Sequence, residues 1–203
     1  MRASTLLIGA AILFGLTAAA AIFPHFPGDV ALARLVQARL PGIAWAEVLT
    51  QAAGAPWKYV LAGAGALIAW RLTGWRGATV VLVAALALPP LGNGLKALAD
   101  RPRPAASLID VVGQPSGASF PSTAAVIYGA VFGSLALLAL AVRPRRWLLA
   151  AACVLVLLAA GAARVTLGAH WPSDVLAGYL LAFVGAAAVQ RVLKSKDSSG
   201  TNP

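Results

Sequence analysis

Runs of apolar residues, each about as long as a membrane-spanning helix, alternate with short polar stretches along most of the chain. Roughly 20 apolar residues are enough to cross the hydrocarbon of a bilayer. The pattern therefore predicts membrane spans near residues 4–23, 56–72, 77–98, 121–142, 147–166 and 173–192. We expect an all-α polytopic membrane protein, a six-transmembrane-helix bundle that forms one domain over 1–193. The polar residues 194–203 are expected to be a disordered cytoplasmic tail.

Two segments near the N-terminus need separate interpretation. Residues 4–23 follow Arg2 and end in small residues, as a signal peptide does, but the apolar run is longer than usual for one. An even number of spans also keeps both termini on one side, so we expect this span to be retained. Further on, residues 30, 32, 35, 36 and 40 are apolar and approximate one helical face, which predicts an interfacial helix.

The composition agrees with a membrane protein. Of the 203 residues 60% are hydrophobic and 11% charged, and the mean hydropathy is +0.83, more apolar than a soluble domain requires. The net charge of +10 would suggest a nucleic-acid partner in a soluble protein, but here the basic residues flank apolar spans. We expect contacts with membrane lipids and no nucleic acid. Cys153 lies inside an apolar run and, as the single cysteine, has no partner for an internal disulfide.

Basic residues also predict the orientation. If the spans alternate, one side of the membrane receives Arg2, Arg71, Arg76, Arg143, Arg145, Arg146, Arg191, Lys194 and Lys196. The positive-inside rule makes that side cytoplasmic and indicates a plasma membrane, the inner membrane in bacteria. The opposite side, facing the periplasm or the outside, receives Lys96, Arg101, Arg103 and Arg164, which the rule does not explain.

These outer cations accompany groups suited to phosphate chemistry. Arginine donates paired hydrogen bonds to phosphate, and a helix opened by Pro121 would add its first backbone N–H groups. Asp174 follows His170 by one helical turn, so its carboxylate could fix one ring nitrogen and leave the other free to attack phosphorus. Taken singly, each group has an ordinary interpretation as an anchor or a helix cap. Their common order on one face favours a phosphate site.

The same residues resemble the type 2 phosphatidic acid phosphatase superfamily of membrane lipid phosphatases, over about 49–181. Its first motif, K-x6-R-P, fits Lys96, Arg103 and Pro104, whereas the Arg-Pro pair at Arg101 is out of register. Its third motif, S-R-x5-H-x3-D, fits Arg164, His170 and Asp174, with Ala163 in place of serine.

The resemblance implies a lipid phosphatase with a phospho-histidine intermediate. His170 would be the nucleophile and Asp174 the group that orients it. The phosphate would be held by Lys96, Arg103, Ser122, Thr123 and Arg164. The substrate would be a phosphate or diphosphate ester of a lipid, with no obligate protein partner. We expect no cofactor and no metal, because an excess of cations would repel a divalent ion.

The second motif, P-S-G-H, departs from the family. Thr123 replaces its glycine, and Ala124 stands where the family has the histidine that protonates the leaving group. His25 is the only other histidine and lies in a loop distant in sequence. Loss of a general acid slows a reaction about 10²–10⁴-fold. Ala124 is either an engineered substitution, which we favour because everything else that the chemistry needs is intact, or a natural change. In the second case the chain would be a phospholipid-binding pseudo-enzyme; a lipid transporter is a further alternative.

Overall fold

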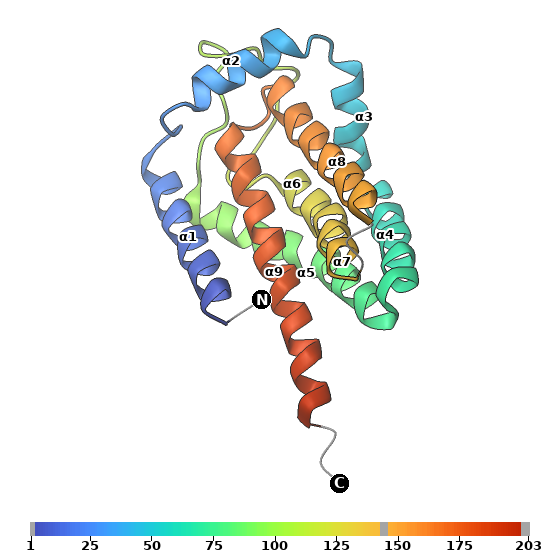
Figure 1. The fold of residues 1–203 in the computed structure, drawn as a ribbon. Coiled ribbons are helices and arrows are strands. Elements are labelled where there is room, and N and C mark those ends of the chain that lie inside the picture. The colour runs from blue at the N-terminus through green and yellow to red at the C-terminus, as the bar shows by residue number, and fades with distance from the viewer. Residues whose placement is uncertain (1–2, 143–145, 200–203) are drawn as a thin grey trace.

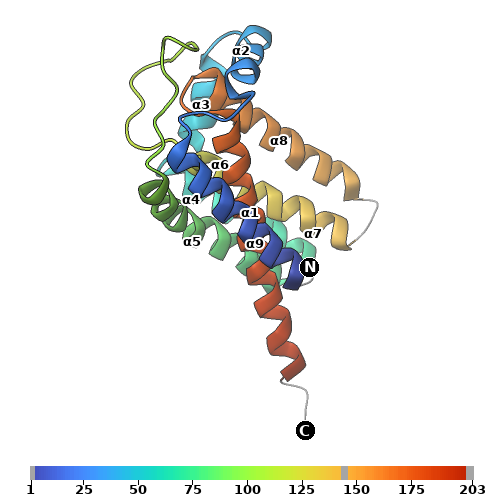
Figure 2. The same ribbon diagram turned by 90° about the vertical axis from the view of Figure 1, so that its left-hand side faces the viewer.

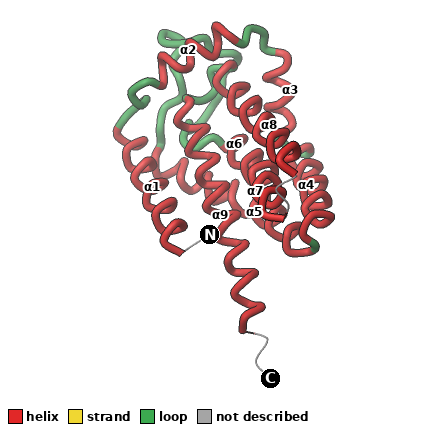
Figure 3. The backbone as a smooth tube through the Cα atoms, viewed as in Figure 1, coloured by secondary structure: helices red, strands yellow, loops and turns green. Residues whose placement is uncertain are grey.

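The fold was analysed in a computed structural model that describes residues 3–142 and 146–199. Arg2, Arg143 and Arg145, three of the cations used for orientation, lie outside the described residues. Helices joined by loops make up the described chain, which contains no strand (Figure 3). The elements are α1 (Ala3–Ile22), α2 (Asp29–Arg39), α3 (Ala44–Ala52), α4 (Trp57–Thr73), α5 (Trp75–Ala99), α6 (Thr123–Tyr128), η1 (Gly129–Gly133), α7 (Ser134–Val142), α8 (Trp147–Thr166) and α9 (Pro172–Ser199). The all-α prediction is confirmed.

Five helical segments of the described chain are long and apolar enough to cross a membrane, by length and composition. They are α1, α5, the continuous α6–η1–α7 segment, α8 and the first 23 residues of α9. The sixth predicted span corresponds to α4, which has 17 residues and lies against α5. α4 is thus at the short end of what spans a bilayer. The count of six spans is approximate for this reason.

The α6–η1–α7 segment forms the centre of the bundle (Figure 1). In its most apolar stretch of 18 residues 72% are buried, against 22–39% in the corresponding stretches of the other four spans. Glycines allow α9 to approach it closely: a Cβ atom on Gly129 would lie 2.7 Å from Ala182 Cβ. One on Gly178 would lie 2.7 Å from the backbone oxygen of Ser122. Small residues at such contacts are typical of helix packing in membranes.

The predicted disordered tail differs from the structure. α9 continues to Ser199, and residues 200–203 lie outside the described part of the chain. The first helix-breaking residue after the apolar span is Gly200, so nothing in the intervening sequence stops the helix.

A layer of short helices and loops lies across one end of the bundle (Figures 1 and 2). α2 is tied to this layer by Gln37, whose side-chain amide donates to the carbonyl of Asp110 at 2.7 Å, and by Arg34, which donates to Leu108 O at 2.9 Å. The apolar face predicted for α2 does not pack as a whole against the bundle. Ala33 is buried, whereas Leu32 and Leu35 are exposed.

Candidate active site

His170 occupies the tight turn between α8 and α9. Gly168 has a φ of 61°, and a Cβ atom there would lie 2.1 Å from the backbone oxygen of Asp110, so the turn requires glycine. Pro172 begins α9, where its missing N–H costs nothing. Asp174 accepts a hydrogen bond from the Trp171 backbone N–H at 2.9 Å, which caps the first turn. The turn thereby brings the carboxylate of Asp174 to the imidazole of His170.

The two ring nitrogens of His170 face different groups. Nδ1 lies 3.5 Å from Asp174 Oδ2, which is an ion-pair distance and longer than a well-formed hydrogen bond. Nε2 lies 3.5 Å from Arg103 Nη1, on the side of the cations. Burial lowers the pKa of His170 to about 4, although the contact with Asp174 acts in the opposite direction. The imidazole is therefore neutral at pH 7, with a lone pair available for attack.

Lys96 and Arg103 hold the loop that faces the histidine. Lys96, in the last turn of α5, donates to the carbonyls of Ala118 at 2.9 Å and Ser119 at 3.2 Å. Arg103 donates from Nη1 to the Ala169 carbonyl at 2.6 Å. Its Nε donates to the carbonyls of Ser116 and Gly117, in the loop that Lys96 also holds. Burial lowers the pKa of Arg103, opposed by the charge of Asp174. Both cations are thus held in place by backbone oxygens, which carry no formal charge.

Arg164 completes the cationic group from the end of α8. Its Nη1 donates to Thr50 Oγ1 in α3 at 2.9 Å. Its Nε is buried and makes no hydrogen bond within the described residues. The charge of Arg164 acts on both Lys96 and His170, which places all three within electrostatic reach. A buried N–H without an acceptor, beside several cations, suits an anionic ligand.

Ser122, Thr123 and Ala124 lie where α6 begins. The buried hydroxyl of Ser122 accepts a hydrogen bond from Ala125 N at 3.4 Å, and its backbone N–H donates to the Asp174 carbonyl at 3.0 Å. Thr123 is the first residue of α6. Ala124 is partly buried against the apolar cluster between α3 and α8. A backbone hydrogen bond therefore joins the second motif to the third. The side chain at position 124 is a methyl group, which cannot donate a proton.

Sequence reasoning missed two side chains. Arg101, set aside as out of register, is completely buried and forms an ion pair with Asp174, Nη1 to Oδ1, at 2.6 Å. The repeated Arg-Pro pair was the signal that could have found it. His25, distant in sequence, packs against Trp171 with ring centroids 5.5 Å apart. It thus lies beside the residue that follows the candidate nucleophile.

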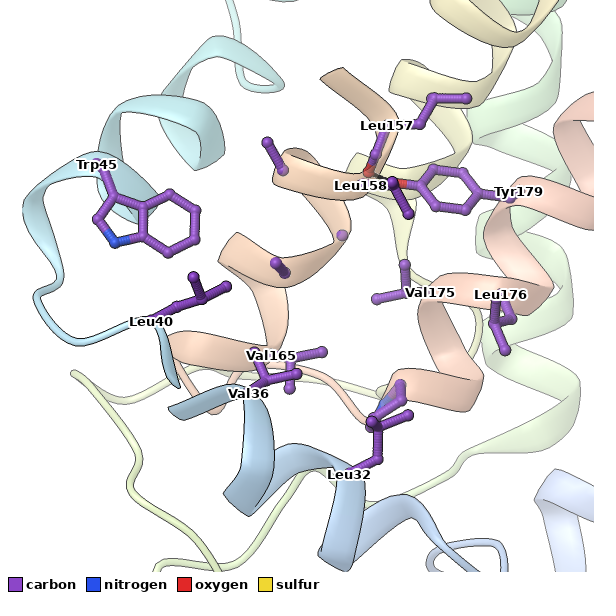
Figure 4. A pocket seen from close by; sticks show the side chains of 14 residues that line it. Leu32, Val36, Leu40, Trp45, Leu157, Leu158, Val165, Val175, Leu176 and Tyr179 are labelled. Atoms are coloured by element: carbon purple, nitrogen blue, oxygen red, sulfur yellow. Dashed lines mark hydrogen bonds between the residues drawn. The ribbon is translucent and has the colours of Figure 1, made fainter. Parts of the chain in front are cut away.

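An apolar groove of about 580 Å³ opens beside this turn, between α2, α3, α8 and α9 (Figure 4). Leu32 and Val36 line it from α2, and Leu158 and Leu176 from the spanning helices. The groove contains none of the candidate phosphate-binding residues. However, its lining includes Val165, the neighbour of Arg164 in sequence. An apolar surface therefore begins where the cationic group ends.

Comparison with known proteins agrees with this arrangement. The sequence model of the PAP2 superfamily matches residues 73–197, which include Lys96, Arg103, Arg164, His170 and Asp174. The chain belongs to the PAP2 superfamily. This PAP2 chain is also similar in fold to a solved structure, the first transmembrane PAP2-type phosphatidylglycerolphosphate phosphatase from Bacillus subtilis. That likeness has a TM-score of 0.66 and 20% identity, over 91% of this chain and 96% of the other. No curated protein sequence matched.

Membership confirms the resemblance drawn from the motifs. With several helices able to span a membrane, this PAP2 protein is a multi-pass membrane protein. PAP2 membership supports a phosphoric ester hydrolase.

Proposed function

We propose that the protein is a lipid phosphatase whose His170 accepts the phosphoryl group. The observation that carries this proposal is the buried, neutral imidazole of His170, with Asp174 at one ring nitrogen and Arg103 at the other. A free imidazole lone pair is a nucleophile, and a nearby carboxylate can stabilise the positive charge that the ring acquires.

The proposed reaction has two steps. Nε2 of His170 attacks phosphorus, and the bond from phosphorus to the ester oxygen breaks as the P–N bond forms. The departing oxygen takes the bonding electrons and needs a proton. In the second step, water attacks phosphorus and the P–N bond breaks, which releases inorganic phosphate. Lys96, Arg103 and Arg164 would neutralise the phosphate oxygens throughout, and the Ser122 hydroxyl would complete the cradle.

Ala124 leaves the departing oxygen without a proton donor. We therefore propose that this chain is impaired on lipid alcohols, whose alkoxides are poor leaving groups. The group that protonates the leaving oxygen would also deprotonate the attacking water, so the second step should be slow as well. An aryl phosphate with a stable phenolate avoids only the first difficulty. With p-nitrophenyl phosphate, the chain should therefore release a burst of nitrophenol close to one per protein and then slow down.

The groove supports a lipid as substrate. An acyl chain could occupy the apolar surface lined by Leu158 and Leu176 while the phosphate reached the cations beside Val165. We place this site on the periplasmic or outer face of the plasma membrane, since the cations around it are those that the positive-inside rule does not explain.

The test is phosphate release from a panel of phosphorylated and diphosphorylated lipids, by the chain as it stands and by Ala124→His. Release by Ala124→His that disappears when His170→Ala is added would support the proposal. If no lipid is hydrolysed by Ala124→His and no nitrophenol burst occurs, the phosphatase proposal is wrong.

Ala124 itself favours a second function. The cationic cradle does not include this position, so a chain with alanine there would still bind lipid phosphates. Binding without hydrolysis in both forms would identify a phospholipid-binding protein rather than an enzyme.

A further inference from the structure

Arg101 connects the segment that leads into α2 with the first turn of α9 through its buried guanidinium. Its side chain is 0% exposed. Its Nη2 donates to Asp29 Oδ2 at 3.0 Å, and its Nη1 donates to Asp174 Oδ1 at 2.6 Å and to Ser173 Oγ at 2.9 Å. Its Nε donates to the Phe23 carbonyl at 3.3 Å. Every nitrogen of the guanidinium therefore has an acceptor.

The two carboxylate oxygens of Asp174 have different hydrogen-bond partners. Arg101 takes Oδ1, whereas Oδ2 accepts from the Ser119 hydroxyl and from the Trp171 backbone. Oδ2 is also the oxygen nearest to His170 Nδ1. Arg101 at Oδ1, together with Ser119 and Trp171 at Oδ2, holds the carboxylate in the orientation that directs Oδ2 at the ring.

Asp29 fixes Arg101 from the opposite side. This carboxylate is 4% exposed and lies in the first turn of α2. Its Oδ1 accepts from the Ser173 backbone N–H at 3.0 Å, and its Oδ2 accepts from the Ser173 hydroxyl at 2.7 Å and from Phe26 N at 2.8 Å. A connected row of charged groups thus runs from α2 through Arg101 and Asp174 to His170.

This row lies on the Nδ1 side of the imidazole, whereas Arg103 lies at Nε2. A buried ion pair is weak evidence for stability, since desolvation offsets much of the attraction between the charges. In some proteins such pairs instead serve to fix one orientation of the buried groups.

We infer that Arg101, held by Asp29, is a positioning residue that acts through Asp174 to keep the proton of His170 on Nδ1 and the lone pair on Nε2. The inference rests on the proposed nucleophilic role of His170. It gives α2 a part in the reaction, because Asp29 of α2 is linked to the imidazole through Arg101 and Asp174.

The direct test is ¹⁵N NMR of the full chain in detergent micelles, with ¹⁵N-labelled histidine. The chain has two histidines, so His25→Gln assigns both sets of ring signals. At pH 7 His170 should show a protonated Nδ1 and an unprotonated Nε2. Arg101→Met should give a mixture of tautomers. Asp29→Asn should shift the signals in the same direction by a smaller amount, and Arg101→Lys should lie between Arg101→Met and the unchanged chain.

Arg34→Met is the matched control. Arg34 also ties α2 to the outer loops, through Leu108, but it is not in the row of charges. Its replacement should leave the His170 signals unchanged. If Arg34→Met shifts them as much as Arg101→Met does, the effect is a general loosening of the layer and the inference is wrong. If Arg101→Met fails to fold, Asp29→Asn and Arg101→Lys carry the same test.

Burst kinetics with p-nitrophenyl phosphate separate positioning from folding. The amplitude counts folded active molecules, whereas the rate constant reports the attack by His170. Arg101→Met should lower the rate constant about 10- to 100-fold, by analogy with the removal of groups that orient metal-binding side chains. Inhibition by inorganic phosphate should be unchanged.

A fall in amplitude alone, with an unchanged rate constant and unchanged NMR signals, would overturn the inference. Absence of a burst in the unchanged chain would instead contradict the proposed function. The NMR result remains readable in that case, so the two failures are distinguishable.

Discussion

Replacing Ala124 by histidine tests the chemistry assigned to the first turn of α6. The position lies two residues after Ser122, which is bonded to the backbone of Asp174, and it is partly buried. A positioned general acid contributes about 10²–10⁴ in rate, equivalent to about 3–5 kcal/mol of barrier. We expect Ala124→His to raise hydrolysis of a lipid phosphate by that factor, measured as phosphate release in mixed micelles.

The larger side chain must also be accommodated. Position 124 packs against the cluster between α3 and α8, and an oversized residue in such a place costs about 1–3 kcal/mol of stability. The melting temperature should therefore fall while the rate per folded molecule rises. The nitrophenol burst rate should change little, because a phenolate leaves without protonation. Equal rates of lipid hydrolysis for alanine and histidine at 124 would refute the assignment of this position to the missing acid.

Five further outcomes are expected. Since the pKa of His170 is lowered to about 4, the burst rate should be constant near neutral pH and fall as the pH approaches 4. The ring favours its neutral form when folded, so the stability that this preference contributes should be present above about pH 6.5 and be lost as the pH falls from there toward 4. In a chain with Cys153→Ala, a membrane-impermeant maleimide applied from outside should label Ala106→Cys and spare Arg145→Cys; the reverse pattern would invert the topology. Hydrolysis by Ala124→His should survive EDTA, and loss of activity that magnesium restores would contradict the metal-free mechanism. Ala162→Phe, in the groove, should raise KM for a long-chain lipid phosphate and not for p-nitrophenyl phosphate, whereas Ala152→Phe, on an exposed part of α8 outside the groove, should change neither.

Hydropathy and motif spacing predicted the features that are local in sequence. An apolar run of about 20 residues has few alternatives to a spanning helix, and the all-α class follows from that. The spacing of His170 and Asp174 places them one helical turn apart, and the structure brings their side chains together. The roles of these residues in catalysis stay predictions.

Contacts between distant segments could not be predicted in the same way. Arg101 meets Asp29, 72 residues earlier, and Arg164 meets Thr50, 114 residues earlier. Neither pair has a fixed spacing, because the helices between them can vary in length without altering the contact. The groove arises similarly from four helices whose apolar residues, taken one helix at a time, look like ordinary lipid-facing positions.

The close approach at Gly178 has a consequence for how related sequences are interpreted. A methyl group there would lie 2.7 Å from the Ser122 carbonyl oxygen and 2.8 Å from Ala125 Cβ, and neither atom belongs to a flexible side chain. A homologue with alanine at this position could retain all the motif residues and yet hold its second and third motifs too far apart to grip one phosphate. Surveys that infer activity by counting motif residues would class it as competent. The spacing between two helices, set by a residue that touches no substrate, is therefore as diagnostic of a working phosphatase as the histidine itself.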